Sequence, residues 1–153
     1  MDQGKLFENI SIVSVKLVKE RDSYYGTKII RNSDDLASIV KRLLKDTDRE
    51  VFLTVNLSTA KTINSIHVVS TGSVDRTIVH PREVFKAAIL SNAHSIALAH
   101  NHPSGDTTPS LEDIDLTKLL VQSGNILWIK IIDHIIVAGD KHLSFADQKI
   151  GGL

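Results

Sequence analysis

The stretch that most constrains this chain runs from His100 to Asp113 and joins a short apolar run to a segment with a helix-start signal. The apolar run Ser95–Ala99 predicts a buried strand, and Ser110 is placed to begin a helix. Two prolines and a glycine between them predict a constrained loop. The chain is therefore expected to fold here as strand, tight loop and helix.

The polar side chains of this stretch form a pattern typical of a metal site. His100 and His102 are two residues apart on an extended segment, so both imidazoles project from one face. Asp113 follows in the first helical turn, where the helix dipole keeps a carboxylate ionised. Three protein ligands of this kind leave the fourth position of a zinc ion free for water. We therefore predict one catalytic Zn²⁺ per chain.

Ser110 and Asp113 also have a purely structural interpretation. The pattern Ser-x-x-Asp resembles a capping box, in which both residues only start a helix. That interpretation leaves unexplained the two histidines that point the same way on the preceding strand. We therefore retain the metal site and keep the cap as the alternative.

Composition limits the class of protein. The chain has 153 residues, 18 basic and 18 acidic side chains and a net charge of zero, which suits about one globular domain. Zero net charge removes the global attraction on which non-specific nucleic-acid binding depends. The absence of cysteine excludes disulfides and cysteine-type zinc sites. No signal-like N-terminus or membrane-length apolar run is present, so we expect a cytoplasmic protein with no membrane partner.

The N-terminal half predicts one helix and three strands. The first strand is expected over Ile10–Val18, followed by a solvated linking segment at 19–32 with a turn at Tyr24-Tyr25-Gly26. Further strands are expected over Val51–Leu57 and near Ile63–Ser70. Ser33 is predicted to cap a helix whose apolar residues follow at i, i+3, i+4, i+7 and i+8, namely Leu36, Ile39, Val40, Leu43 and Leu44.

The C-terminal half predicts two helices and three strands. Gly124 is expected to close the helix that begins at Ser110, after it has run to about Ser123. Strands are expected over Ile126–Ile132 and His134–Val137, with a sharp change of direction near Asp133. The helix from Pro81 to about Asn92 is predicted to turn four residues inward, namely Val84, Phe85, Ala88 and Ile89.

Strands mixed with three helices predict an α/β fold, a three-layer α-β-α sandwich with a central mixed sheet. We expect a single domain over residues 1–153. Residues 1–32 are interpreted as its N-terminal strand and linking segment. The tail at 148–153 is expected to have little to pack against and to fray.

These residues also give a specific family resemblance. His100-x-His102-Pro103, followed by Ser110 and Asp113, resembles the His-x-His…Ser-x-x-Asp signature of the JAB/MPN+ (JAMM) metalloprotease-like domains. The longer string His-Asn-His-Pro-Ser-Gly-Asp-x-x-Pro-Ser-x-x-Asp is similar to the RadC branch of that superfamily. Two further RadC-type motifs, Val79–Ala88 and Ile132–Val137, extend the resemblance over roughly residues 33–146. It implies a JAB/MPN (cytidine-deaminase-like) fold.

The resemblance also implies a role for each site residue. His100, His102 and Asp113 would bind zinc, and Ser110 would contact the oxyanion of a tetrahedral intermediate. The general base of the family is a glutamate at the start of an upstream strand, and Glu50 has the matching place. Zinc would lower the pKa of its water toward about 7, and the carboxylate would take the proton. The implied reaction is hydrolysis of a peptide or isopeptide bond.

The general base has two candidates. Glu50 is alternatively a surface carboxylate at a strand end. Glu83 competes for the role, although it lies where acids that start a helix are common.

Other polar residues near the site receive supporting roles. Glu112 is expected to point away from the metal, Asp106 to order the loop, and Asn101 to point away from its neighbours and hydrogen-bond the loop. Asp133-His134 suits support of a ligand imidazole better than a fourth zinc ligand. No role is assigned to four histidines, namely His67, His80, His94 and His142.

Two other classes of function stay open. The RadC name suggests a DNA-repair accessory, and the basic residues and tyrosines of 19–32 offer contacts to nucleic acid. Zero net charge does not support that partner, and two histidines with one aspartate suit zinc better than magnesium. Longer RadC relatives carry a helix-hairpin-helix-like region that we do not find here. The third class is a non-catalytic interaction module, which has no need of all three ligands.

Overall fold

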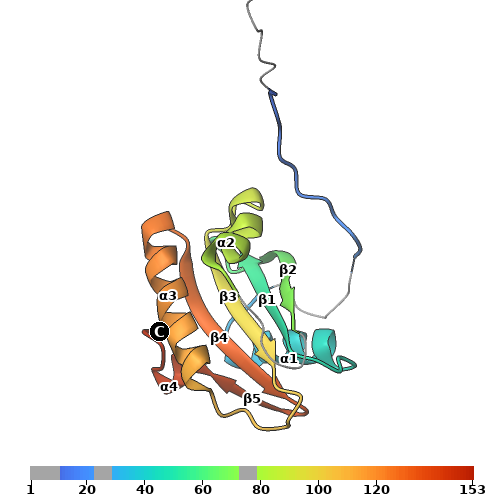
Figure 1. Cartoon of the computed structure of the whole chain (residues 1–153), viewed down its shortest axis with the longest axis vertical. Helices are drawn as coiled ribbons and strands as arrows, with labels where there is room; N and C mark the ends of the chain where they lie inside the picture. The colour runs from blue at the N-terminus through green and yellow to red at the C-terminus, as the bar shows by residue number, and fades with distance from the viewer. Residues whose placement is uncertain (1–10, 23–28, 73–78) are drawn as a thin grey trace, which may run out of the picture.

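A computed structural model describes residues 11–22, 29–72 and 79–153 (Figure 1). No helix in these ranges is long and apolar enough to cross a membrane. The elements follow in the order α1 (Ser33–Leu44), β1 (Val51–Leu57), β2 (Ile63–Thr71), α2 (Pro81–Leu90), β3 (Ser95–Asn101), α3 (Leu111–Leu127), β4 (Lys130–Ala138), β5 (Lys141–Ser144) and α4 (Phe145–Gln148).

The five strands form one mixed sheet in the order β2-β1-β3-β4-β5. β1 pairs antiparallel with β2 and β3, and β5 pairs antiparallel with β4. β3 and β4 are parallel, so the chain must cross over between them, and α3 makes that crossover. The predicted mixed sheet is confirmed.

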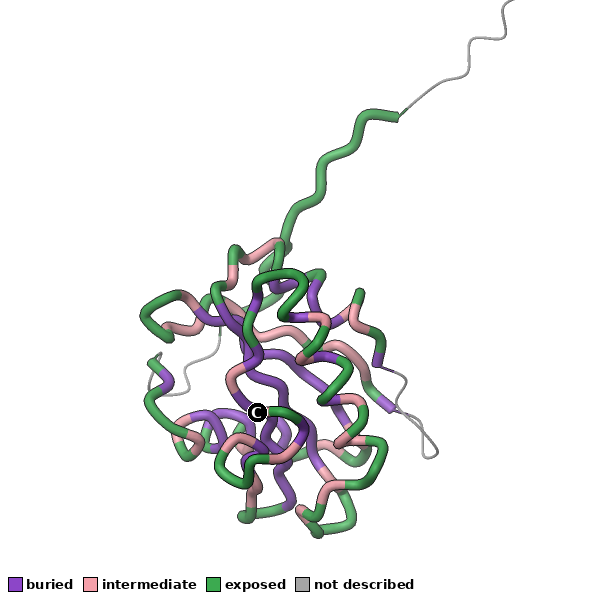
Figure 2. Tube along the Cα trace, turned by 90° about the vertical axis from the view of Figure 1, so that its left-hand side faces the viewer, coloured by how far each residue is buried: buried purple, intermediate pink, exposed green. Residues whose placement is uncertain are grey.

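Alternating side chains of the central strands pack against helices on both faces of the sheet. Leu53 and Val55 of β1 belong to one buried cluster with residues of α1. Phe52 of β1 and Leu98 of β3 belong to a second cluster with residues of α2 and α3. Every residue of β1 and β3 is buried, and Figure 2 shows the buried residues concentrated in the middle of the molecule. The fold is the predicted three-layer α-β-α sandwich.

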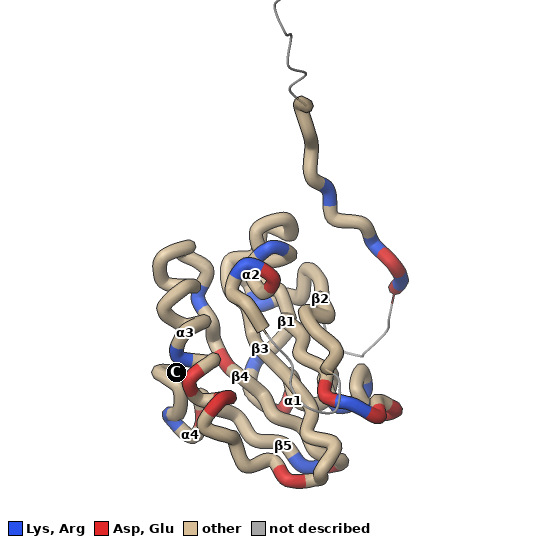
Figure 3. The backbone as a smooth tube through the Cα atoms, viewed as in Figure 1, with Lys and Arg blue, Asp and Glu red and all other residues tan. Residues whose placement is uncertain are grey.

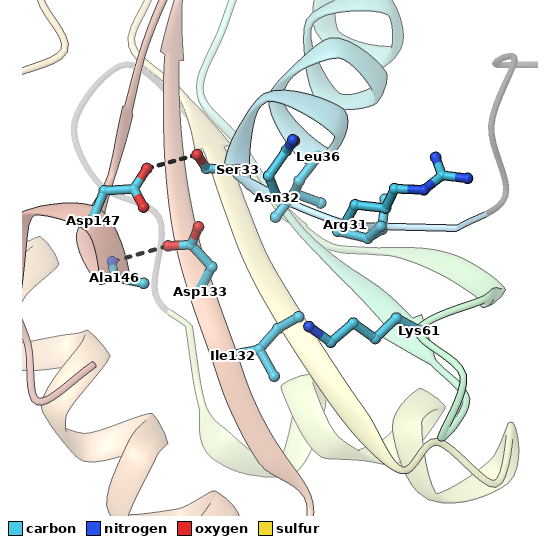
Figure 4. A pocket seen from close by; sticks show the side chains of 10 residues that line it. Arg31, Asn32, Ser33, Leu36, Lys61, Ile132, Asp133, Ala146 and Asp147 are labelled. Carbon is cyan, nitrogen blue, oxygen red and sulfur yellow. Dashed lines mark hydrogen bonds between the residues drawn. The ribbon is translucent and has the colours of Figure 1, made fainter.

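Helix α1 begins one residue earlier than the sequence predicted. Its N-cap is Asn32, whose side-chain oxygen accepts a hydrogen bond from the Asp35 amide at 2.8 Å. The Ser33 hydroxyl instead donates to Asp147 at 2.6 Å (Figure 4). Both residue types cap helices well, so adjacent candidates cannot be ranked without the tertiary partner. The apolar face that was predicted packs inward.

Two details of α2 and α3 differ from the prediction. Ile89 is 54% exposed rather than inward, and Ala87 is buried in α2 instead. Helix α3 does not close at Gly124 but continues to Leu127. A Cβ atom at Gly124 would lie 2.5 Å from the Ile129 carbonyl oxygen. Glycine at this position therefore allows the chain after α3 to pass close to the helix.

β4 is one strand where two were predicted. Residues 126 and 127 belong to α3, and the strand runs without a break from Lys130 to Ala138. The expected change of direction near Asp133 is only a shift in register, because Ile96 pairs with Ile131 but Ala97 pairs with Asp133. A one-residue bulge of this kind turns side chains to the other face without ending the strand.

The C-terminal tail packs against the domain, so the expectation that it has little to pack against is wrong. Gly151 is buried and Leu153 packs against the core cluster under α2 and α3. The Asp133 carboxylate accepts hydrogen bonds from the Ser144 hydroxyl at 2.8 Å and from the Ala146 amide at 3.1 Å. These contacts position α4 beside a small cavity of about 170 Å³ that also touches α1 (Figure 4).

The strand predicted over Ile10–Val18 is not formed in its described part. Residues 11–22 are extended and exposed, and Ile12 is fully exposed (Figures 1 and 2). Alternating apolar residues favour a strand only where a neighbouring strand supplies hydrogen bonds, which the pattern alone does not show. Ile10 and the predicted turn at Tyr24-Tyr25-Gly26 lie outside the described residues.

Candidate metal centre

Three predicted ligands converge where β3 ends and α3 begins. His100 is on β3, His102 follows the strand, and Asp113 is in the first turn of α3. The two Nε2 atoms of the histidines lie 2.9 Å apart. Asp113 places one carboxylate oxygen 3.4 Å from Nε2 of His100 and the other 3.6 Å from Nε2 of His102. One ligand atom from each residue lies within 4.8 Å of the other two.

Both imidazoles present Nε2 to the carboxylate because their Nδ1 atoms are occupied elsewhere. Nδ1 of His102 donates to the Asp106 carbonyl oxygen at 2.7 Å, since a carbonyl can only accept. Nδ1 of His100 lies 2.8 Å from Nε2 of His134. Nε2 of His102 therefore faces Asp113, either bare, as a metal ligand must be, or with a proton that pairs with the carboxylate. Two nitrogen donors and one carboxylate oxygen fit a zinc ion, and these three residues would hold it.

Charge distribution at the centre favours a bound cation. Burial lowers the pKa of His100 to about 4, although the Asp113 charge opposes this. Burial alone would raise the pKa of Asp113, but contacts from His102, His100 and Ser110 hold that pKa well below its usual range. The interaction with Asp113 raises the pKa of His102. The carboxylate is thus ionised and attracts positive charge, either a proton on His102 or a metal ion.

Ser110 and Asp113 also form the capping box that was the structural alternative. The Asp113 amide donates to the Ser110 hydroxyl oxygen at 3.1 Å. The Ser110 amide and hydroxyl donate to one Asp113 carboxylate oxygen at 2.8 Å and 2.7 Å. The cap and the ligand cluster therefore occur together. The cap orients the Asp113 carboxylate toward the histidines.

Glu50 lies beside the centre because of strand register. β1 is antiparallel to β3, with Phe52 opposite His100, so Glu50 continues to the level of His102. Burial, and then the Asp113 charge, raise the pKa of Glu50. The Glu83 side chain is 43% exposed and pairs with Lys86 at 2.7 Å. Of the two candidates for general base, the geometry favours Glu50.

Asn101 holds the segment that carries Glu50. Its side chain points to the face opposite the histidines, as predicted, but it bonds the chain before β1 instead of the loop after β3. The side-chain oxygen accepts from the Val51 amide at 2.7 Å, and the side-chain nitrogen donates to the Arg49 carbonyl at 3.0 Å and the Thr47 hydroxyl at 3.1 Å. These bonds bracket Glu50 on both sides.

Replacing Asn101 with alanine should loosen this segment without removing a ligand. The Val51 amide loses its acceptor, and an unpaired buried donor costs about 1–3 kcal/mol of unfolding free energy. We expect faster hydrogen exchange at the Val51 amide, measured by NMR, with zinc stoichiometry unchanged at saturating zinc. Asn64→Ala is the control, because Asn64 is exposed and makes one long bond to the Ser91 carbonyl. Equal exchange in the two variants would contradict the assignment.

The remaining predicted residues surround the ligands. Glu112 is exposed. The Asp106 carboxylate accepts from the amide and hydroxyl of Thr108 at 2.9 Å and 2.8 Å, so Asp106 orders the loop. His134 is fully buried and contacts the clustered residue His100, but it is not itself one of the three clustered ligands. Thr117, which the prediction missed, contacts His134 at 2.7 Å. Its place one helical turn after Asp113 was the available signal.

Comparison with known families decides the classification. A model of the RadC-like JAB domain matches residues 30–150, most of the chain. The chain belongs to the RadC-like JAB domain family. That match contains every helix and strand of the structure and all three clustered ligands.

Three relatives of this RadC-like JAB domain carry the name UPF0758 protein. The chain is 43% identical to one from Desulfitobacterium hafniense over 122 residues, which cover 80% of this chain and 54% of the relative. It is 47% identical to one from Desulforamulus reducens over 78% of this chain and 53% of the relative. A third relative, TTE0897 of Caldanaerobacter subterraneus, is 44% identical over 78% of this chain and 51% of the relative. The chain spans about half the length of these curated relatives.

Proposed function

We propose that this RadC-like JAB domain is a zinc-dependent hydrolase that cleaves a peptide or isopeptide bond with metal-activated water. The observation that carries the proposal is the convergence of His100, His102 and Asp113 within 4.8 Å, with Glu50 just before the neighbouring strand β1, whose Phe52 is opposite His100. Three ligands plus a separate base is the arrangement that hydrolytic zinc sites use. The JAMM-like sequence pattern around the same residues supports this chemistry.

Each residue has a distinct task in the proposed reaction. Zinc held by the three ligands would polarise the scissile carbonyl and acidify a water molecule. Glu50 accepts the proton of the attacking water at its carboxylate and returns it to the leaving amine. Its raised pKa suits both steps, because a base works best when its pKa is near the working pH. The Ser110 hydroxyl, which donates to Asp113 in this structure, would turn its hydrogen to the developing oxyanion.

Glu50→Gln tests the proposal. Zinc-supplied protein should contain one zinc ion per chain and cleave members of a library of peptides and isopeptide-linked peptides. Chelation should stop cleavage, and added zinc should restore it. Glu50→Gln should keep the zinc and lose at least about 10²-fold in rate, because glutamine cannot take a proton.

Glu83→Gln is the matched control, since Glu83 is exposed and pairs with Lys86. It should cleave at the rate of the unmodified protein. Absence of zinc from zinc-supplied protein, or equal cleavage by the Glu50 and Glu83 variants, would reject the proposal.

We also propose a binding partner and a cellular compartment for this domain. The partner is a peptide or isopeptide substrate, and a chain without cysteine suits the reducing cytoplasm. The nucleic-acid alternative gains no comparable support. Figure 3 shows acidic and basic residues close together on α2, and the whole chain has zero net charge. An interaction module without activity would not require the convergent ligands.

A further inference from the structure

A chain of buried hydrogen bonds links one proposed zinc ligand to another. The Thr117 hydroxyl donates to the Asp113 carbonyl oxygen at 2.6 Å and lies 2.7 Å from Nδ1 of His134. On the far side of that ring, Nε2 of His134 lies 2.8 Å from Nδ1 of His100. Thr117 and His134 are fully buried, and His100 is 1% exposed. The chain therefore runs from α3 through β4 to β3 away from solvent.

The Thr117 hydroxyl fixes the direction of the first two bonds in this chain, and the protonation of His134 fixes the third. A hydroxyl carries one hydrogen, and a carbonyl oxygen can only accept, so the Thr117 hydrogen points to Asp113. The Thr117 oxygen must then accept a hydrogen from Nδ1 of His134. If His134 carries a single hydrogen, its Nε2 accepts from Nδ1 of His100, which leaves Nε2 of His100 bare.

The surroundings of His134 keep that ring neutral. It lies between the ring of Phe52, with centroids 5.5 Å apart, and the ring of Phe145, at 4.6 Å. Its nitrogens contact a hydroxyl and another imidazole. None of these four groups is an anion, and a buried charge without a counter-charge is strongly disfavoured. One hydrogen on the ring is therefore the state that fits the site.

We propose that Thr117 and His134 are positioning residues that select the tautomer of His100 and turn its bare Nε2 toward the metal position. The device rests on the zinc site of the proposed function but not on the hydrolysis. It begins at the backbone of one ligand, Asp113, and ends at the ring of another. In a histidine that binds a metal, the ring nitrogen that does not bind is commonly hydrogen-bonded to such a partner, which orients the ring.

Loss of the Thr117 hydroxyl should release this selection. Without that hydroxyl, a hydrogen on Nδ1 of His134 has no acceptor. The ring is then more stable with its hydrogen on Nε2. That hydrogen would then be donated to Nδ1 of His100. His100 would carry its own hydrogen on Nε2, where it blocks metal binding. The expected defect is therefore a change of tautomer, which a simple packing defect would not produce.

The first test is long-range ¹H–¹⁵N NMR of the imidazoles in the metal-free protein. In the unmodified chain we expect hydrogen on Nδ1 of both His100 and His134. Thr117→Val keeps the shape of the side chain but removes the hydroxyl, and should show hydrogen on Nε2 of His134. Thr117→Ser keeps the hydroxyl and should restore the original pattern. Hydrogen on Nε2 of either ring in the unmodified chain would overturn the inference, whatever the stability of the variants.

The second test is zinc affinity, measured by competition with a chromogenic chelator. Thr117→Val should bind zinc about 10–100-fold more weakly, and Thr117→Ser within about threefold of the unmodified protein. Unchanged affinity in Thr117→Val would overturn the positioning role. If the unmodified chain bound no zinc but showed the expected tautomers, the proposed function would fail while the selection of the His100 tautomer stood.

Discussion

Asp113→Asn should reduce zinc affinity by at least about 10³-fold. Loss of a residue that only supports a ligand costs about 10–100-fold, and Asp113 supplies the single charged donor of the cluster. Its oxygens lie 3.4 Å and 3.6 Å from the two imidazole nitrogens. The other two members of the cluster are histidines, so the cluster holds no second carboxylate to replace it. Competition titration against a chelator, with metal analysis after dialysis, measures the loss.

The control for this variant is Glu112→Gln. Glu112 is the neighbouring acid in the same helical turn but is exposed. The zinc affinity of the Glu112→Gln protein should therefore equal that of the unmodified protein. Asparagine keeps a side-chain oxygen that can accept from the Ser110 amide, so much of the helix cap is retained. Urea unfolding of the metal-free variants separates loss of metal from loss of fold. Full zinc occupancy in dialysed, folded Asp113→Asn would contradict the assigned ligand set.

Phe85→Ala should lower the free energy of unfolding by about 3–5 kcal/mol, the range for removing a buried aromatic side chain. Phe85 is 2% exposed and reaches from α2 to α3. A Cβ atom at Gly124 would lie only 3.3 Å from its ring, so the two helices meet closely there. Truncation leaves a cavity at this contact. Urea denaturation followed by circular dichroism measures the effect.

Ile89→Ala is the matched change on the same helix. Ile89 is 54% exposed, so its truncation should cost less than about 1 kcal/mol. Comparable destabilisation by the two variants would show that Ile89 faces the core, as the sequence pattern suggested, and would contradict the orientation of α2.

The convergence of the three candidate ligands was predictable because their placement follows local rules. His100 and His102 share a face through strand alternation, and Ser110 starts a helix that carries Asp113. His100 lies at the end of β3 and Asp113 in the first turn of α3, so mainly a loop separates these candidate ligands. Glu50 came from the family resemblance, and the antiparallel pairing of β1 with β3 explains its place.

The errors occur where distant parts of the chain decide the structure. Glycine commonly ends a helix, but Gly124 lies inside α3, where its close neighbours are Phe85 and the Ile129 carbonyl. The bulge in β4 depends on pairing with β3. The helical spacing puts Thr117 one turn after Asp113, but the role that we propose for it also needs His134 from β4. Sequence periodicity carries no information about such partners.

The short spacing of the two histidine ligands has a consequence for calorimetry. An unfolded chain still carries His100 and His102 with only one residue between them, so the denatured state retains some attraction for zinc. A ligand raises the melting temperature only by its preference for the native form, and binding to the denatured form subtracts from it. Zinc-induced thermal shifts should therefore understate the affinity found by equilibrium titration of the native domain.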